Sequence, residues 1–355
     1  MPKYIDENTK LVIDYDQAAF QSAAALEKRE IKAIHKASGR SMTFKNRTEF
    51  YGKKKNSLEG SWLGDQNTMR EAKGQRPFSK DEFDIEDVQI ASEVSHTLYE
   101  CKRRIENYCK HLGIEDYFGV IGKGETFRHE LPLPQKYKSN RDTALRPLLL
   151  TEAKDYLVEY HEGKIVTGIE ADDMLTRYGY RGWLDYKKTG KFSYLVGTMD
   201  KDQRGTPCLY FDIFAQKGKF RDPDPILIDD GLGEIWLQKG EVKGYGAKWL
   251  AVQMCKGDES DHVRPYQDFG IVYGDTSCYH DFHDAKSAKD LFTRVLNRFV
   301  EWFPDGVEYD AWNGQHMKLN SLEWANMMFK LVYMHRIKDD PTTFTKLLQH
   351  YGVLK

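Results

Sequence analysis

Short apolar runs that end at carboxylates constrain the fold of this chain more than any other feature. Residues 11–13 form one run that ends at Asp14, and residues 192–197 form another that is soon followed by Asp200. A third run covers residues 117–121. Such runs, separated by segments with helical spacing, are typical of buried parallel strands. We therefore predict an α/β fold with a central, mainly parallel sheet flanked by helices, and ligands at the strand ends.

The segments between these runs indicate helices. Ala and Glu favour a helix over residues 17–36, and apolar residues recur at helical spacing over residues 87–112. Residues 156–169 suggest a helix, a turn at Gly163 and a short strand. After about residue 243 the chain is predicted to be mainly helical, at 247–255, 288–302 and 321–334. We therefore expect a first domain over residues 1–242 and a helical region over 243–355.

A polar, basic segment with aromatic residues occupies about residues 37–85. Lysine and arginine side chains can hold a phosphate backbone while aromatic rings stack on nucleobases. A solvated insertion or hairpin accounts for the composition equally well. The candidate substrate-binding residues in this segment are Lys45, Arg47, Lys53, Lys54 and Lys55, and the interspersed aromatic residues are Phe44, Phe50, Tyr51 and Trp62.

Charge and cysteine content limit the class of protein. The 355 residues carry 53 basic and 55 acidic side chains, so any nucleic-acid contact must come from local patches rather than a basic coat. The 5 cysteines form no CxxC pair, which argues against a zinc site or a disulfide framework. No apolar run approaches the roughly 18 residues of a membrane span, and the N-terminus lacks a signal core. We therefore expect a cytoplasmic protein that makes no contact with a membrane.

Four acidic groups lie beside apolar segments or in turns flanked by glycine. Clustered carboxylates raise one another's pKa, and divalent cations relieve that repulsion. Magnesium prefers hard oxygen ligands, and two ions about 3.5–4 Å apart can assist an in-line displacement at phosphorus. Any single group is explained as well by a helix cap or a solvated turn. The groups are Asp14 with Asp16, Glu170 with Asp172 and Asp173, Asp200 with Asp202, and Asp258 with Asp261.

The order of these motifs resembles the bacteriophage and bacterial 5′-nucleases of the flap-endonuclease, PIN-like family. The likeness is nearest to phage 5′-3′ exonucleases, including those known as ribonuclease H, and runs from about residue 11 to 265. Asp14 matches the family's first metal-binding aspartate. The other matching segments are Gly-Ile-Glu-Ala-Asp-Asp-Met-Leu at 168–175, Thr-Met-Asp-Lys-Asp at 198–202, Lys-Gly-Asp-Glu-Ser-Asp-His at 256–262, Thr-Phe-Arg-His-Glu at 126–130 and Lys-Tyr-Lys-Ser-Asn-Arg at 136–141.

The resemblance implies an enzyme, a phosphodiesterase that cleaves DNA at 5′ ends or flaps with two Mg²⁺ ions, for which Mn²⁺ can substitute. The RNA strand of RNA–DNA hybrids is a further candidate substrate, and replication proteins are candidate partners. If the chain is phage-encoded, it would act in the host cytoplasm. The helical region 243–355 would contact DNA. The implied first-ion ligands are Glu170, Asp172, Asp173 and Asp200, and Asp14 would bind a metal ion or its water. The implied second-ion ligands are Asp202, Asp258 and Asp261. The implied phosphate contacts are Arg128, Lys138, Arg141 and Lys136.

The sequence departs from the family pattern at three places. Residues 120–125 lack the aspartate that usually ends the second strand, and Glu125 is the nearest acid. His262 stands where the family usually has asparagine. Residues 264–274 replace the glycine-rich helix-hairpin-helix. These departures favour one alternative, a DNA-binding protein on the same fold with impaired catalysis. A ribonuclease of the PIN group is another alternative, although its members are usually shorter and carry fewer acids.

Overall fold

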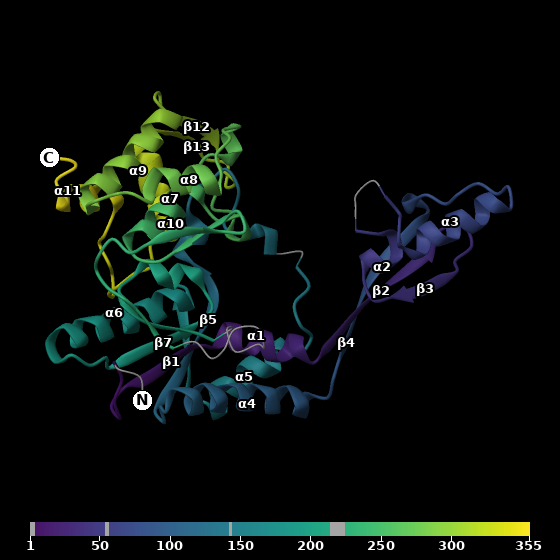
Figure 1. Cartoon of the computed structure of the whole chain (residues 1–355), viewed down its shortest axis with the longest axis horizontal. Coiled ribbons are helices and arrows are strands. Elements are labelled where there is room, and N and C mark those ends of the chain that lie inside the picture. The colour runs from purple at the N-terminus through teal and green to yellow at the C-terminus, as the bar shows by residue number, and fades with distance from the viewer. Residues whose placement is uncertain (1–3, 54–56, 142–143, 214–223) are drawn as a thin grey trace. The chain divides into compact units, whose positions relative to one another are not determined.

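The computed structural model describes residues 4–53, 57–141, 144–213 and 224–355 (Figure 1). The chain divides into two compact units. The larger unit combines residues up to Ala18 with Lys102–Leu145 and Lys154–Lys355, and the smaller unit combines Ala19–Cys101 with Arg146–Ala153. None of the helices in the described part of the chain is long and apolar enough to cross a membrane.

The larger unit is built on a six-stranded sheet, which confirms the predicted α/β class. Its strand order is β6-β5-β1-β7-β8-β9, and every pairing is parallel except that of β9 with β8. The central strand β1 pairs with β5 on one side and β7 on the other, with Leu11 opposite both Tyr117 and Leu195. The strands are β1 (Lys10–Asp14), β5 (Tyr117–Thr126), β6 (Gly163–Gly168), β7 (Tyr194–Thr198), β8 (Cys208–Asp212) and β9 (Ile226–Ile228).

Helices cover both faces of this sheet. Helix α6 (Ala171–Thr189) packs Leu175 against Val12 and Val196 of the central strands. Helix α4 (Val94–Leu112) lies on the other face, where the Tyr108 ring meets that of Phe211 on β8. Alternate residues of each strand face opposite sides, so these apolar runs are buried on both faces. Helices α1 (Tyr15–Ala25) and α5 (Leu150–Tyr160) complete the connections between strands.

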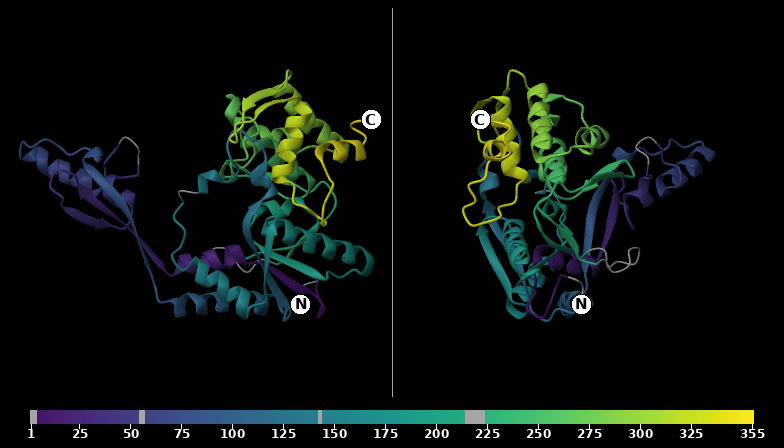
Figure 2. Two further views of the ribbon diagram at one scale, coloured as in Figure 1. Left: turned by 180° about the vertical axis from the view of Figure 1, so that it is seen from behind. Right: turned by 60° about the vertical axis from the view of Figure 1, so that its left-hand side comes forward.

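The C-terminal half of the larger unit is a helical cluster, as the sequence predicted (Figure 2). Its core contains the fully buried Trp324 and Phe299. The cluster contacts the carboxyl ends of the sheet strands, since Trp249 Nε1 donates to the carbonyl of Lys201 over 2.8 Å. The helices are α7 (Ala247–Lys256), α8 (Asp275–Phe282), α9 (Ala288–Trp302), α10 (Ser321–Val332) and α11 (Phe344–His350). Two hairpins that the sequence reading missed are β10 (Ile235–Gln238) with β11 (Glu241–Gly244) and β12 (Val307–Asp310) with β13 (His316–Leu319).

The smaller unit corrects two helix predictions. The predicted helix 17–36 ends at Ala25, and β2 (Glu27–His35) follows. The predicted helix 87–112 begins only at Val94, after β4 (Phe83–Ala91). Both mispredicted stretches are strands of a three-stranded antiparallel sheet in the order β3-β2-β4, with β3 at Ser41–Phe44. The physical reason is the alternation of buried and more exposed residues along β2, a period of two that its Glu and Lys content hid.

Aromatic residues of the segment 37–85 form the core of the smaller unit. Phe50 is fully buried and Phe44 nearly so, and both pack with Trp62 and Phe83. The described part of the segment is therefore folded, with β3 in a hairpin with β2, and Phe44 and Phe50 are held mainly by the core. Two helices, α2 (Arg47–Tyr51) and α3 (Trp62–Ala72), cover this core.

Candidate active site

The acidic residues of the larger unit meet at one edge of its sheet. Asp14 is the last residue of β1, Asp200 follows β7, and Glu170 follows β6 as the N-cap of α6. These strands are parallel, so their carboxyl ends share an edge. The N-terminus of α6 adds a partial positive charge beside the acids of its first turn, which include Asp172.

Four carboxylates at this edge, Asp14, Asp172, Asp200 and Asp202, form no ion pair with any residue that the structure describes. Burial and the neighbouring Asp16 raise the pKa of Asp14 to about 7, although the amide of Gln17 donates to its carboxylate. Burial, Asp200 and Asp14 raise the pKa of Asp172 well above its usual range. Burial also raises the pKa values of Asp200 and Asp202, and each feels repulsion from other carboxylates of the cluster.

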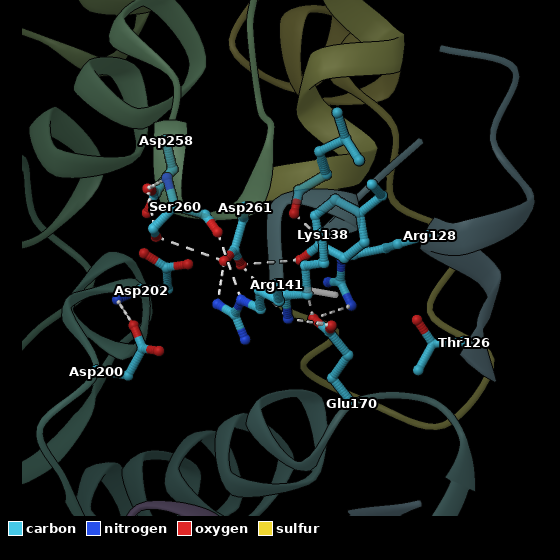
Figure 3. A network of polar contacts seen from close by, with 12 residues as sticks. Thr126, Arg128, Lys138, Arg141, Glu170, Asp200, Asp202, Asp258, Ser260 and Asp261 are labelled. Carbon is cyan, nitrogen blue, oxygen red and sulfur yellow. Dashed lines mark hydrogen bonds and ion pairs between the residues drawn. The ribbon is translucent and has the colours of Figure 1, made fainter. Parts of the chain in front are cut away.

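Basic side chains neutralise the other acids of the site (Figure 3). Lys138 Nζ lies 2.5 Å from Glu170 Oε1 and 3.4 Å from Asp261 Oδ2, and Arg141 also pairs with Asp261. Burial opposes the charge on Lys138, but Glu170 and Asp261 raise its pKa overall. Glu170 and Asp261 also share the hydroxyl of Tyr137, 3.3 and 3.2 Å away. Lys138 and Arg141 thus lie beside the carboxylates of the site.

Another predicted ligand, Asp258, is paired with Lys201 at 2.8 Å. Burial disfavours its charge, but the Lys201 ammonium lowers the pKa of Asp258 overall. A small cavity of about 10 Å³ lies between these groups, lined by Asp202, Asp258 and Asp261 among others. That volume holds about one water molecule or one ion.

The turn that carries Asp258 and Asp261 depends on backbone conformations that few residues adopt. Gly257 has a φ of +75°, and a Cβ there would lie 2.1 Å from the Val263 carbonyl oxygen. His262 has a φ of 56°, a left-handed conformation in which histidine, like asparagine, is enriched. This tolerance accounts for histidine at the position where the family usually has asparagine.

Arg128 and Asp173 do not occupy the places that the resemblance implied. Both side chains are fully buried, and Arg128 donates to Asp173, to Glu170 and to the carbonyls of Leu331 and Tyr333. Burial opposes ionisation of Asp173, but Arg128 lowers its pKa overall. Because its donors are already used inside the protein, Arg128 is not presented to a phosphate. Asp173 likewise faces Arg128 rather than the open carboxylates.

No nearby acid of the described residues replaces the aspartate that the family usually has at the end of the second strand. Glu125 has a side chain that is 71% exposed and pairs with Lys136 at 2.8 Å. Gly122, in the middle of β5, donates its amide to Asp16 over 2.8 Å, and Asp16 also pairs with Lys154. Asp16 is thus a partner of the backbone and of a lysine, and Glu125 lies on the surface.

The other predicted basic residues belong to the smaller unit. Arg47 makes a two-pronged ion pair with Asp87, at 2.6 and 2.8 Å. Lys45 and Lys53 are exposed. Lys54 and Lys55 lie outside the described residues.

Sequence reading missed several side chains that shape the site. Lys201 lies inside the Asp-Lys-Asp motif, and Tyr137 lies between the two lysines of 136–138, so motif position could have identified both. The Thr198 hydroxyl lies 3.0 Å from Asp14, and Gln253 Nε2 donates to Asp202 over 2.6 Å. Gln253 comes from the buried face of α7, and no local pattern signals its role.

The donor set suits a hard divalent cation, but it is not a finished coordination shell. No group of three or more His, Cys, Asp or Glu side chains among the described residues is arranged to hold a metal ion. The four carboxylates without a cationic partner nonetheless repel one another in a partly buried place, and oxygen is the ligand type that magnesium prefers. Magnesium usually keeps several waters, so a few carboxylates suffice to bind it. The chemistry of the donors therefore fits magnesium.

No protein-family model matches this chain, and no curated protein matches it. A crystal structure of the T5 D15 protein co-crystallised with metal ions is similar over 97% of this chain and 98% of that chain, with 12% identity and a TM-score of 0.45. The bacteriophage T5 D15 flap endonuclease, in a pseudo-enzyme–product complex with DNA and metal ions, is similar over 73% of this chain and 90% of that chain, with 14% identity and a TM-score of 0.39.

Proposed function

We propose that this chain is a metal-dependent 5′-nuclease of the flap-endonuclease type that hydrolyses DNA phosphodiesters. One observation carries the proposal. Asp14, Asp172, Asp200 and Asp202 come from separate parts of the chain to one sheet edge and have no cationic partner among the described residues. Such an arrangement costs folding free energy unless a cation binds there.

In this proposal the four open carboxylates, with Glu170, hold magnesium ions at the strand ends. Asp258 and Asp261 line the neighbouring small cavity and provide further ligands once their lysine and arginine partners turn to the substrate. Bound magnesium ions would lower the pKa of the attacking water and offset charge on the scissile phosphate.

The basic residues of the site then bind the DNA backbone. Arg141 is suited to this role because its side chain is 50% exposed and its guanidinium fork matches phosphate geometry. Lys138, which lies between Glu170 and Asp261, can pair with a non-bridging phosphate oxygen and hold it beside the carboxylates. Contacts of this kind position the backbone without reading bases, so we expect little sequence preference.

The test compares two variants with the same change of charge. Asp172→Asn removes an open carboxylate, whereas Asp155→Asn changes an exposed residue of α5 in the same unit. End-labelled duplex, nicked, flapped and RNA–DNA hybrid substrates are incubated with Mg²⁺ or Mn²⁺. We expect Asp172→Asn to lower the cleavage rate by more than about a hundredfold, since ligand loss exceeds the cost of losing a residue behind the ligand. The rate of Asp155→Asn should match that of the unaltered chain. Equal cleavage by both variants contradicts the proposed site.

A second function, DNA binding without cleavage, is favoured by a specific observation. Glu170, Asp258 and Asp261 are neutralised by Lys138, Lys201 and Arg141, as in a protein that needs no metal there. The same substrate panel separates the two functions. Tight binding with no product under either ion would establish the binding role and exclude the nuclease.

A further inference from the structure

The smaller unit contains a hollow of about 570 Å³ that is lined by aromatic and basic side chains. This aromatic hollow is defined by Phe44, Trp62, Phe78 and Phe83 together with Arg40 and Arg70. Its volume lies within the range of roughly 300–1,000 Å³ that is common for small-ligand sites. No acidic side chain lines it among the residues that the structure describes.

The secondary structure explains why these side chains gather. Trp62 and Arg70 are eight residues apart on α3, with the lining residue Gln66 midway, so the three share one helix face. Met42 and Phe44 are two residues apart on β3 and point to the same side of the sheet. The aromatic hollow thus lies between one face of a helix and one face of the small sheet.

The two arginines are available to an anionic partner. Arg40 is exposed and pairs with no acid in the described part of the chain. Arg70 has its guanidinium carbon 3.9 Å from the centre of the Phe78 ring, and its Nε donates to the carbonyl of Arg76. Its two terminal nitrogens have no acidic partner among the described residues, so the charge is held in place over an aromatic ring.

A second hollow of about 500 Å³ adjoins the first, because Phe83 lines both. This lysine hollow is lined by Lys36, Lys53 and Lys80, and also by Asp81 and Asp84. Lys36 lies 3.5 Å from Asp84, and Lys80 Nζ lies 4.6 Å from the centre of the Tyr51 ring. Two adjacent hollows, one aromatic with arginines and one with lysines, match the alternation of base and phosphate along a single strand.

We propose that the smaller unit binds single-stranded nucleic acid, with a base in the aromatic hollow and phosphates at Arg40, Arg70 and the lysine hollow. The identification of the strand as nucleic acid rests on the proposed function. The hollow itself is independent of the carboxylate site, so binding here requires no metal ion.

The first experiment measures the affinity of the full chain for a labelled oligothymidylate by fluorescence anisotropy, with EDTA present to prevent cleavage. Arg40→Glu is compared with Lys73→Glu, which makes the same change of charge at an exposed residue outside both hollows. We expect Arg40→Glu to weaken binding about tenfold more than Lys73→Glu. It should also lower the slope of log affinity against log salt concentration by about one. Equal effects of the two variants would overturn the proposal.

The second experiment asks whether a base lies against Trp62. Oligothymidylate should quench part of the tryptophan fluorescence, and Trp62→Phe, which keeps an aromatic ring, should abolish that part. An abasic strand of the same length should bind about five- to a hundredfold more weakly than oligothymidylate, the range expected for loss of one stacked base. Equal binding of the abasic strand, or of polyglutamate of equal charge, would show that charge alone is recognised and would refute the stacking site.

The two proposals fail in different ways. Asp172→Asn should keep the Trp62-dependent fluorescence quenching by oligothymidylate in EDTA, whatever its cleavage rate. If the unaltered chain does not cleave DNA but shows Trp62-dependent binding, the proposed nuclease is refuted and the proposed single-strand site is supported. Cleavage that persists with no Trp62-dependent binding does the reverse.

Discussion

Arg128 and Asp173 form a buried, two-pronged ion pair at the N-terminus of α6, with Nη1 2.6 Å from Oδ2 and Nη2 3.0 Å from Oδ1. The same arginine donates to the carbonyls of Leu331 and Tyr333, and the amide of His335 donates to Asp173. The pair therefore joins the end of the sheet to the segment at the end of α10. Its contacts favour a role in holding the larger unit together.

Arg128→Met should lower the free energy of unfolding by about 3–5 kcal/mol, because it leaves the carboxylate of Asp173 buried without its partner. Urea denaturation followed by circular dichroism measures the effect. Arg181→Met, on the exposed part of α6, is the control and should change stability by less than about 0.5 kcal/mol. Adding Asp173→Leu to Arg128→Met should recover part of the loss, since an apolar pair can replace a buried ion pair. Unchanged stability together with weaker DNA binding would instead support the phosphate contact first expected for Arg128.

Stability without divalent cations should fall as the pH rises from about 5 to about 8. The pKa of Asp14 is raised from 3.8 to about 7, and that of Asp172 is raised well above 3.8. Between the unfolded and folded pKa values the folded chain holds more protons, so its stability decreases as they are released. Melting temperatures in EDTA should drop by about 5 °C or more across this range. The lowered pKa of Asp173 acts below 3.8 and does not affect this window.

Two further measurements test whether the carboxylates cause this pH dependence of the melting temperature. At pH 8, Mg²⁺ should raise the melting temperature of the unaltered chain. Asp172→Asn should be more stable than the unaltered chain in EDTA and should gain less from Mg²⁺. A flat pH profile, or an equal gain from Mg²⁺ in both proteins, would show that the cluster is neither strained nor a metal site.

Arg141→Gln should weaken DNA binding in the presence of Ca²⁺, chosen as a divalent ion that binds oxygen ligands. One lost phosphate contact lowers the slope of log affinity against log salt by about one. Arg181→Gln supplies the matched loss of charge at a surface residue of the same unit. If both variants keep the unaltered slope, Arg141 serves only to neutralise Asp261.

Gly257→Ala should destabilise the protein and lower cleavage, because its methyl group would meet the Val263 carbonyl and displace the turn of Asp258 and Asp261. Gly270→Ala is a close control, since Gly270 has nearly the same φ, +73° against +75°, and open space around it. The control carries only the cost of a left-handed alanine, about 1–2 kcal/mol. Thermal melts and cleavage rates of the two variants separate crowding from backbone conformation. Equal losses in both would exclude the crowding explanation.

The sheet of the larger unit could be predicted because its central strands are short apolar runs followed by acids. The runs at 117–121 and 192–197 correspond to β5 and β7, and residues 288–302 match α9 to the residue. The meeting of Asp14 and Asp200 followed from parallel pairing alone. Such long-range contacts can be predicted from the sequence when the strands are buried on both faces, because the strands are then continuous apolar runs.

The smaller unit could not be predicted in the same way. Its strands are half-exposed and rich in charged residues, so residues 27–35 have helix-forming composition although they pair as a strand. Tertiary pairing with β4 decides their conformation. The burial of Arg128 was equally hidden, since its partners Leu331 and Tyr333 lie more than 200 residues further along the chain. A motif indicates which residues are present, but not whether an arginine faces a substrate or the core.

The position of β1 between β5 and β7 also determines when the sheet can form on the ribosome. Leu11 of β1 cannot pair until Tyr117 of β5 and Leu195 of β7 have been synthesised. The segment Ala19–Cys101 is synthesised after β1 and before β5. Pairings this distant in sequence form slowly. A nascent chain that has not reached residue 198 carries a central apolar strand with an unpaired edge, which is a template for aggregation. Added chaperones, which shield exposed strand edges, should therefore raise the soluble yield of this protein.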